Sequence, residues 1–391
     1  MTGSNHMQRP LRVAHVITGL NVGGAEVALE RLVTTLPPDD FDCRVWSLGS
    51  VGEVGERLRQ RGVMVDALDI RASPLSVIDA ARKLRARLKA FAPSIVQGWM
   101  YHGNLAALAC APRGDVAPVV SWNIRGSLDS LPFEKPLTRA VIRLSRWFAT
   151  RADAIVNNSD ASARAHEQLG YPRDRWVMIP NGFDVDRFAP SVTMRAAFRQ
   201  GYELAQSSLL VGAVGRFVPV KGHAVLLEAL QRLAGVIPQI VGVFAGPGLE
   251  AGNAAFARLC RDLAPSVRII ALGNVAEPER LLPALDVLCL PSLSEGFPNV
   301  VAEAMSCAVC CVVTDVGDAR WIVGDAGLVV PPGDAELLSE ALGSALRWNA
   351  AEREHRGQLG RQRIVRKFSL GAMRDAYATL YQRLAMSEAG R

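Results

Sequence analysis

The sequence predicts an α/β protein built from two doubly wound parallel sheets. With 391 residues, the chain is too long for a single core, since one domain usually takes roughly 150 residues. Short apolar runs alternate with amphipathic helical patterns along most of the chain, which is typical of parallel sheets covered on both faces. A composition of 49% apolar and 21% charged residues excludes collagen-like and intrinsically disordered proteins.

The first series of elements predicts an N-terminal domain over residues 11–190, preceded by a leader at 1–10 that we expect to be a cloning remnant or disordered. Its strands are predicted where short apolar runs end at glycine or polar residues. They are expected at 12–17, 43–48, 63–68, 94–99, 118–122 and 153–158, with helices at 25–36, 76–91, from about 104, 136–150 and 161–169.

The second series predicts a C-terminal domain over residues 191–367. A proline-containing, charge-mixed stretch at 189–207 separates the two series. Strands are expected at 209–215, 240–246, 267–272, 287–290, 309–314 and 327–330, and helices at 223–233, 250–260 and 299–307. Residues 334–386 carry a helical pattern only, and we predict that 368–391 form a helix that crosses back to the N-terminal domain.

Charge and cysteine usage narrow the class of protein. The 44 basic residues exceed the 38 acidic ones, which favours an anionic partner such as a phosphate, a nucleotide, a lipid headgroup or a nucleic acid. No run of about 18 apolar residues and no signal peptide is visible, so we expect a cytoplasmic protein. The seven cysteines predict reduced, packed thiols, because the C-x-x-C spacing of Cys307 and Cys310 lacks a second pair at zinc-site spacing.

Three loops that follow predicted strands carry candidate ligand-binding residues. In the first, Gly23 and Gly24 precede a helix, where free amides attract a phosphate or a sugar oxygen. The loop lacks the G-x-G-x-x-G spacing of dinucleotide-binding proteins. In the second, GRFVPVKG, the cations Arg216 and Lys221 lie five residues apart and can converge on one diphosphate.

The third loop, SEGFPNVVAEAM, combines acidic side chains with a helix start. Glu295 follows a strand, and the amides of residues 296–299 begin a helix in which Pro298 costs no hydrogen bond. Glu303 lies on the same helix, so both carboxylates can face one ligand. Carboxylates accept hydrogen bonds from hydroxyls and amides donate to oxygens, which suits a polyhydroxylated ligand with an anionic part.

Together these segments resemble the retaining family 4 glycosyltransferases. SEGFPNVVAEAM resembles their Glu-x7-Glu motif, GRFVPVKG their donor-diphosphate loop, and GLNVGGAE their first glycine loop. The segments NGFDVDRF (181–188) and GLVVPPGD (327–334) also match, so that the resemblance covers nearly the whole chain in family order.

The resemblance implies a GT-B fold, in which two Rossmann-like domains face each other across a cleft, and a role for each matching residue. His102 would approach the donor sugar and the acceptor, Arg216 and Lys221 would stabilise the leaving diphosphate, and Glu295 would hold the donor sugar. These four are the expected catalytic residues. The expected donor-binding residues are Gly23, Gly24, Arg216, Lys221, Glu295, Gly296, Phe297, Pro298, Asn299, Val300 and Glu303.

The resemblance also implies the reaction. We expect retaining hexosyl transfer from a nucleotide-diphosphate sugar, with UDP favoured over GDP, to a glycan or a polyprenyl-diphosphate-linked acceptor in surface polysaccharide or glycoconjugate biosynthesis. No metal and no other cofactor is expected, because cations take the role that a metal has elsewhere. Ala308 to Cys310 stand where the family usually has Gly-x-Pro, and Asp318 replaces a common glycine, which bears on donor choice.

Two basic helices suggest where a membrane could be contacted. One carries Arg82, Lys83, Arg85, Arg87 and Lys89, and the other Arg139, Arg143, Arg146 and Arg151 near Trp147 and Phe148. The second resembles an interfacial helix on anionic lipid, which predicts peripheral membrane contact through the N-terminal domain; a solvated face with core aromatics is the alternative. Nucleic-acid binding is not expected, because no known module is present.

Two other functions fit the same motifs. A nucleotide-sugar epimerase of similar fold would turn over the donor without an acceptor. A non-catalytic protein would bind the nucleotide sugar and transfer nothing.

Overall fold

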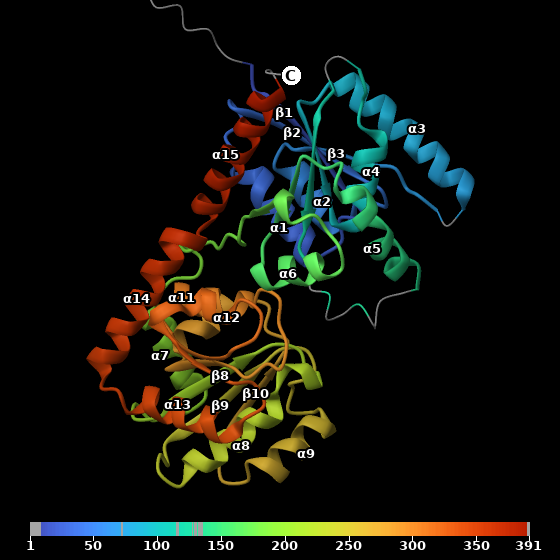
Figure 1. Cartoon of the computed structure of the whole chain (residues 1–391). Helices are drawn as coiled ribbons and strands as arrows, with labels where there is room; N and C mark the ends of the chain where they lie inside the picture. Colours follow the sequence, from blue (N-terminus) through green and yellow to red (C-terminus); the bar gives the residue numbers. More distant parts are fainter. Residues whose placement is uncertain are drawn as a thin grey trace, which may run out of the picture. The chain divides into compact units, whose positions relative to one another are not determined.

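The computed structural model describes residues 9–71, 73–114, 117–126, 128, 131 and 136–388, so most of the predicted leader lies outside the described residues. The chain forms two compact units (Figure 1). Unit 1 comprises the residues up to Gly182 together with those from Leu370 onward, and unit 2 comprises Phe183–Ser369. These boundaries differ by a few residues from the predicted limits at 190 and 367.

In unit 1, the described residues form a seven-stranded parallel sheet in the order β3-β2-β1-β4-β5-β6-β7. Its strands are β1 (Leu11–Ile17), β2 (Phe41–Ser47), β3 (Met64–Ala67), β4 (Ile95–Trp99), β5 (Val119–Ile124), β6 (Ala154–Asn157) and β7 (Trp176–Met178). Its helices are α1 (Gly24–Thr35), α2 (Gly52–Gln60), α3 (Pro74–Phe91), α4 (Met100–Cys110), α5 (Pro136–Ala149), α6 (Asp160–Gln168) and α15 (Leu370–Glu388).

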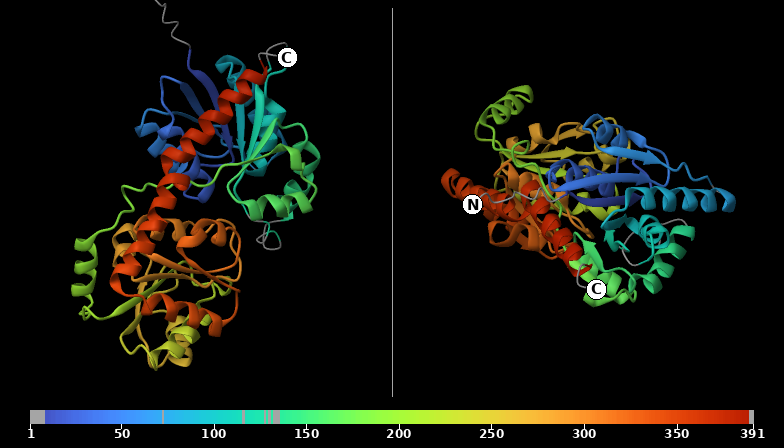
Figure 2. Two further views of the ribbon diagram at one scale, coloured as in Figure 1. Left: turned by 60° about the vertical axis from the view of Figure 1, so that its left-hand side comes forward. Right: turned by 90° about the horizontal axis from the view of Figure 1, so that it is seen from above.

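Both faces of this sheet are buried, because successive side chains of a strand point to opposite faces. In β1, Val13 and Ile17 join a core cluster with residues of α1 and α15, whereas Ala14 and Val16 join a second cluster with residues of α3 and α4. The last helix, α15, lies against the sheet beside α1 (Figure 2).

In unit 2, the described residues form a six-stranded parallel sheet in the order β10-β9-β8-β11-β12-β13. Its strands are β8 (Leu209–Val214), β9 (Ile240–Ala245), β10 (Arg268–Gly273), β11 (Val287–Leu290), β12 (Cys310–Thr314) and β13 (Leu328–Val330). Its helices are α7 (Val192–Gly201), α8 (His223–Ala234), α9 (Ala254–Leu263), α10 (Pro278–Leu281), α11 (Asn299–Ser306), α12 (Ala319–Val323), α13 (Ala335–Arg347) and α14 (Ala350–Phe368).

The predicted fold class is confirmed, since each unit is a doubly wound parallel sheet. Five of the described helices and strands were not predicted: α2, β7, α7, α10 and α12. In α7, which lies in the stretch interpreted as a separator, the buried side chain is Arg199, whose guanidinium contacts Asp286 at 3.1 Å. The buried face of this helix combines Arg199 with the half-buried Phe198, so its apolar periodicity is weak. In addition, α4 begins at Met100 and not near residue 104.

Each sheet has one place where the strand order reverses. In unit 1 this point lies between β1 and β4, and in unit 2 between β8 and β11. The helices that follow these neighbouring strands leave toward opposite faces, so their loops diverge and form a crevice at the carboxyl ends of the strands. The candidate residues are therefore expected in these four loops.

Candidate functional site

In unit 2, the two loops at the reversal point bring Lys221 and Glu295 into direct contact. Lys221 follows β8 and Glu295 follows β11, and the two strands are neighbours in the sheet. The Lys221 Nζ lies 2.6 Å from the Glu295 Oε1, and the Ser292 hydroxyl donates a hydrogen bond of 2.6 Å to the same oxygen. Because these side chains retain only 24% and 10% of their exposure, solvent screens this pair less than a surface ion pair.

Two loops that pack against the segment carrying Glu295 contain positions where only glycine fits: Gly222, before α8, and Gly317, after β12. Gly222 has φ +65°, and a Cβ on it would lie 2.0 Å from the carbonyl oxygen of Pro291. Gly317 has φ +52°, and its Cβ would lie 2.3 Å from the oxygen of Gly296. The Thr314 hydroxyl donates a 2.6 Å hydrogen bond to the Ser292 carbonyl. These contacts fix the loop that carries Glu295 against its neighbours.

Arg216 lies on the same loop as Lys221, but its side chain is exposed. Its carbonyl oxygen lies 3.1 Å from the His223 Nε2, at the start of α8. Burial lowers the pKa of His223, which therefore stays neutral at pH 7 and can donate this hydrogen bond from a neutral ring. The backbone at Arg216 is thus fixed, while its guanidinium extends into solvent at the carboxyl end of β8.

The predicted donor-binding run from Gly296 to Val300 forms the turn into α11. Pro298 is the N-cap residue of this helix and provides no side-chain cap, so the positive end of the helix dipole meets the loop of Glu295. The Phe297 ring packs between Phe183 at 6.2 Å and Trp321 at 6.2 Å. The side chain of Phe297 is therefore structural, and only its backbone is available to a ligand.

Glu303 lies on α11, about one turn beyond the helix start, and is half-buried. It neighbours Arg187, whose guanidinium forms two hydrogen bonds, of 2.9 and 3.1 Å, with the Glu279 carboxylate. The hydrogen bond to Glu279 raises the pKa of Arg187, and the charge of Glu303 adds to this effect. Glu303 thus belongs to a charged cluster of unit 2 that the sequence did not indicate.

In unit 1, Gly23, Gly24 and His102 follow the two strands that flank the reversal point. Gly24 begins α1, and Gly23 adopts the extended conformation before it, where a Cβ would lie 2.4 Å from the Glu26 Oε2. His102 lies in the first turn of α4, directly after β4. Burial lowers the pKa of His102, so its imidazole is neutral at pH 7.

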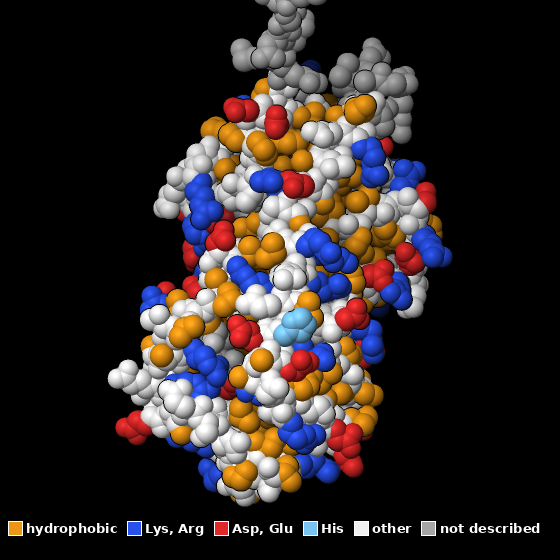
Figure 3. Space-filling view, turned by 90° about the vertical axis from the view of Figure 1, so that its left-hand side faces the viewer, with side chains coloured by type: hydrophobic (Ala, Val, Ile, Leu, Met, Phe, Trp, Pro, Cys, Tyr) orange, Lys and Arg blue, Asp and Glu red, His pale blue; other side chains and the backbone are white. Residues whose placement is uncertain are grey.

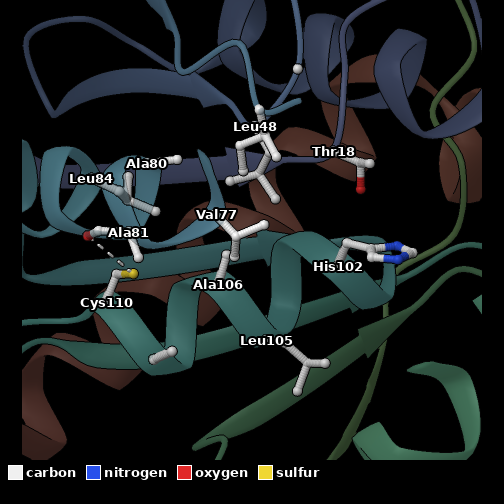
Figure 4. A pocket seen from close by; sticks show the side chains of 13 residues that line it. Thr18, Leu48, Val77, Ala80, Ala81, Leu84, His102, Leu105, Ala106 and Cys110 are labelled. Carbon is white, nitrogen blue, oxygen red and sulfur yellow. Dashed lines mark hydrogen bonds between the residues drawn. The ribbon is translucent and has the colours of Figure 1, made fainter. Parts of the chain in front are cut away.

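A cavity of about 480 Å³ begins at His102 (Figure 4). It extends between α3 and α4, and its lining is almost entirely aliphatic. Thr18, after β1, lies at the same end of the cavity as His102. Gly49, after β2, also lines the cavity and donates a 2.9 Å backbone hydrogen bond to the Thr18 carbonyl. No pattern in the sequence indicates this cavity, because it depends on how closely two helices pack.

Sequence reasoning also missed a polar network in unit 1. Arg125, which follows β5, donates a 3.1 Å hydrogen bond to the Tyr377 hydroxyl of α15 and a second hydrogen bond to Asn181. Asn123 donates to the same hydroxyl at 2.6 Å. Asn123 and Arg125 are each more than 250 residues from Tyr377 in sequence, so no local pattern indicates these contacts.

The two basic helices of unit 1 also expose apolar side chains. On α5, Leu137, Leu144 and Trp147 lie at helical spacing and are 73%, 53% and 69% exposed. The alternative of a core aromatic therefore fails for Trp147. On α14, by contrast, basic and acidic side chains are interspersed (Figure 3). Among the described residues, no helix is long and apolar enough to cross a membrane.

The cysteines flanking the start of β12 are buried. Burial raises the pKa of Cys307 to about 12 and that of Cys310 to about 11, so both thiols are protonated at pH 7. Over the described ranges, no group of three or more His, Cys, Asp and Glu side chains is placed to hold a metal ion.

Comparison with known proteins identifies two family models along the chain. Residues 22–187 match the model described as Glycosyltransferase Family 4, and residues 208–347 match that of Glycosyl transferases group 1. The D-inositol 3-phosphate glycosyltransferase of Corynebacterium urealyticum is 31% identical over 331 residues, which span 76% of this chain and 75% of that enzyme.

A second relative is the UDP-Gal:alpha-D-GlcNAc-diphosphoundecaprenol alpha-1,3-galactosyltransferase of Escherichia coli. It is 30% identical over 61% of this chain and 62% of that enzyme. The match covers 55% of the D-inositol 3-phosphate glycosyltransferase of Geodermatophilus obscurus and 64% of the lipopolysaccharide core biosynthesis glycosyltransferase LpsE of Rhizobium meliloti.

Among solved structures, Anabaena Alr3699/HepE in complex with UDP superimposes with a TM-score of 0.78 at 20% identity, over 95% of this chain and all of that one (100%). At this identity the likeness establishes the fold, which is GT-B. The family models, the inositol-phosphate relative and the fold agree, and the chain therefore belongs to the family 4, group 1 glycosyltransferases.

Proposed function

We propose that this protein is a retaining, metal-independent glycosyltransferase that moves a sugar from a UDP-sugar to a glycan or lipid-linked acceptor. The observation that carries the proposal is the contact between Lys221 and Glu295 at the reversal point of unit 2, with the Nζ and Oε1 2.6 Å apart. The ammonium group of Lys221 can bind a diphosphate, and the carboxylate of Glu295 can accept hydrogen bonds from a sugar.

The diphosphate would bind to Lys221 and Arg216 and to the start of α11. Breaking the bond between the sugar and the diphosphate releases negative charge onto the leaving oxygen. Once the donor is bound, cations and helix amides held against this oxygen would stabilise the charge that develops on it. Because two side-chain cations supply this charge, the proposed reaction needs no metal ion.

The sugar and the ribose would bind to the two glutamates. When a diphosphate takes over Lys221, the carboxylate of Glu295 is released to accept hydrogen bonds from sugar hydroxyls. Ser292 keeps the side chain of Glu295 in place during this exchange, since it donates to Oε1 from the same loop. Glu303, further along α11, would accept from the ribose hydroxyls.

Two solved complexes support the choice of donor. Structures of Anabaena Alr3699/HepE contain UDP and UDP-glucose, and they share this fold with TM-scores of 0.78 and 0.72. We therefore propose UDP as the nucleotide of the donor, and we do not assign the hexose.

The acceptor is proposed from two relatives and one helix. The Escherichia coli relative acts on a diphosphoundecaprenol-linked sugar, and the Rhizobium meliloti relative LpsE takes part in lipopolysaccharide core biosynthesis. An acceptor of this kind is embedded in a membrane. The exposed apolar stripe of α5, flanked by Arg143 and Arg146, is suited to lie at an anionic lipid surface.

Retention is proposed through attack on the same face of the sugar from which the diphosphate departs. This route needs no protein nucleophile, unlike the covalent route of retaining glycosidases. His102 would lie at the acceptor side as a neutral imidazole, because its burial disfavours the charged form.

The experiment that tests the proposal is a transfer assay with radiolabelled UDP-glucose, UDP-galactose and UDP-N-acetylglucosamine, a synthetic lipid-diphosphate-linked N-acetylglucosamine as acceptor, and EDTA in excess. We expect a labelled lipid product that keeps the anomeric configuration of the donor. Donor isomerisation without an acceptor would instead indicate an epimerase, and UDP binding without turnover of any donor would indicate a non-catalytic protein.

A further inference from the structure

The cavity between α3 and α4 has no role in the proposed donor chemistry. Its volume of about 480 Å³ lies within the range of roughly 300–1,000 Å³ that is usual for small-molecule pockets. Its walls are made by small or aliphatic side chains from both helices. They include Val77, Ala81, Leu84, Leu105, Ala106 and Ala109.

The chemistry of the walls selects the ligand. The Thr18 hydroxyl and the His102 imidazole lie at one end, and the Cys110 thiol, which donates a 3.7 Å hydrogen bond to the Ala81 carbonyl, lies at the other (Figure 4). The side chains between these ends are aliphatic. A sugar or a phosphate placed between the helices would lose its hydrogen bonds to water and gain none. An apolar cavity of this size binds a hydrocarbon.

The position of the cavity connects it with the transfer site. Its polar end lies at the carboxyl ends of β1 and β2, beside the reversal point where an open α/β sheet binds its ligand. A molecule whose polar head lies beside His102 could therefore place an attached apolar chain between α3 and α4.

The rim of the cavity continues the apolar surface outward. Val77 lines the cavity and is 52% exposed, and its neighbours on α3, Leu75 and Ile78, are 80% and 49% exposed. These residues lie in the first turns of α3, and the rest of that helix carries the basic side chains from Arg82 to Lys89. Because α3 follows β3, its first turns lie toward the same end of the cavity as His102, so this apolar rim is suited to guide a hydrocarbon chain into the cavity from an anionic lipid surface.

We infer that this cavity binds the first isoprene units of a polyprenyl-linked acceptor, with the diphosphate end of the lipid beside His102. The inference rests on the proposed function for the identity of the lipid, and it adds the site that holds the chain. The enzyme would then select its acceptor by the lipid as well as by the sugar.

The test is equilibrium dialysis of the full-length protein with tritiated farnesol, an uncharged isoprenoid that does not compete for the diphosphate site. Ala106→Phe and Ala109→Phe place a ring in the cavity from α4, and the exposed position of Ala109 makes the second variant safe for folding. Ala86→Phe is the matched control, because Ala86 is exposed on α3 and does not line the cavity. UDP binding is measured in parallel by calorimetry.

We expect farnesol to bind the parent and Ala86→Phe alike, and to bind both cavity variants about tenfold or more weakly, with UDP binding unchanged in all of them. Equal farnesol binding by all four proteins, or no binding, would overturn the inference. Tighter binding of 1-dodecanol than of farnesol would assign the cavity to an acyl chain and overturn it as well. If the parent protein does not bind UDP, the result counts against the proposed function and not against the assignment of the cavity.

Discussion

The ammonium group of Lys221 and the carboxylate of Glu295 lie 2.6 Å apart although 74 residues separate them in the chain. The contact exists because β8 and β11 are neighbours at the point where the strand order of unit 2 reverses. It places a cation and an acid at the start of α11, where an anion is favoured. The proposed donor site is built around this contact.

Arg216→Ala tests the second cation of the donor site. Loss of one hydrogen-bond donor to a developing charge costs about 3 to 4 kcal/mol, so kcat/KM for the UDP-sugar should fall by about two to three orders of magnitude. Because the Arg216 side chain is exposed, the unfolding midpoint should not move. Lys367→Ala, an exposed cation on α14, is the control and should keep full activity. Turnover within a few fold of the parent would remove Arg216 from the mechanism.

Gly222→Ala tests the close approach of the two donor loops. At φ +65° an alanine is strained, and its Cβ would overlap the Pro291 oxygen, so we expect a loss of about 1–3 kcal/mol or more in the free energy of unfolding. Gly235→Ala is the matched control, because its φ is −71° and nothing lies within 4 Å of the added Cβ. That variant should be neutral or more stable by up to about 1 kcal/mol in urea unfolding. Equal stability of the two variants would contradict the described loop packing.

Leu144→Glu tests whether α5 contacts lipid. Burying a leucine is worth about 1.5–3 kcal/mol, so replacing it by a charged residue should weaken binding to phosphatidylglycerol-containing vesicles at least about tenfold in flotation assays. Added salt should weaken the binding of the parent as well. Val192→Glu, at a residue of α7 that is 86% exposed, is the control. Unchanged flotation of Leu144→Glu would rule out this helix as the membrane contact.

His15 should make the stability of the protein depend on pH. Burial lowers the pKa of His15 from 6.5 to about 3. Below pH 6.5 the imidazole is therefore protonated in the unfolded chain, whereas it stays neutral in the folded protein down to about pH 3. This contribution to stability is complete above pH 6.5 and is lost as the pH falls toward 3, by about 1.4 kcal/mol per pH unit. In urea titrations between pH 4 and 7, His15→Asn should therefore show a shallower rise of stability with pH than the parent. Parallel pH profiles for the two proteins would show that His15 does not titrate in this way.

The fold followed from the sequence because its signals are local. Each buried strand is a short apolar run such as Ile240–Ala245, and each candidate loop follows such a run. The residues of the donor motifs could be named for the same reason. That Lys221 touches Glu295 depends on strand order, which no local pattern contains, and the role of Ser292 in holding Glu295 depends on it too.

The features that could not be predicted depend on distant packing. The helix α7 is held by the contact of Arg199 with Asp286, and the Tyr377 hydroxyl joins α15 to Arg125. The cavity between α3 and α4 exists because small residues such as Ala106 lie where two helices meet. In the sequence, Arg199 and Tyr377 are single polar residues in helical patterns and Ala106 is a single alanine, and none of them indicates its distant partner.

The most direct test is a calorimetric comparison of UDP and uridine binding to the parent protein and to Lys221→Ala, in EDTA. If Lys221 holds the diphosphate, the parent should bind UDP far more tightly than uridine, and the substitution should weaken UDP binding by about 1.5–3 kcal/mol, or roughly 10- to 150-fold, while uridine binding stays the same. If Lys221→Ala binds UDP as tightly as the parent, the contact between Lys221 and Glu295 is only structural and the proposed donor site is wrong.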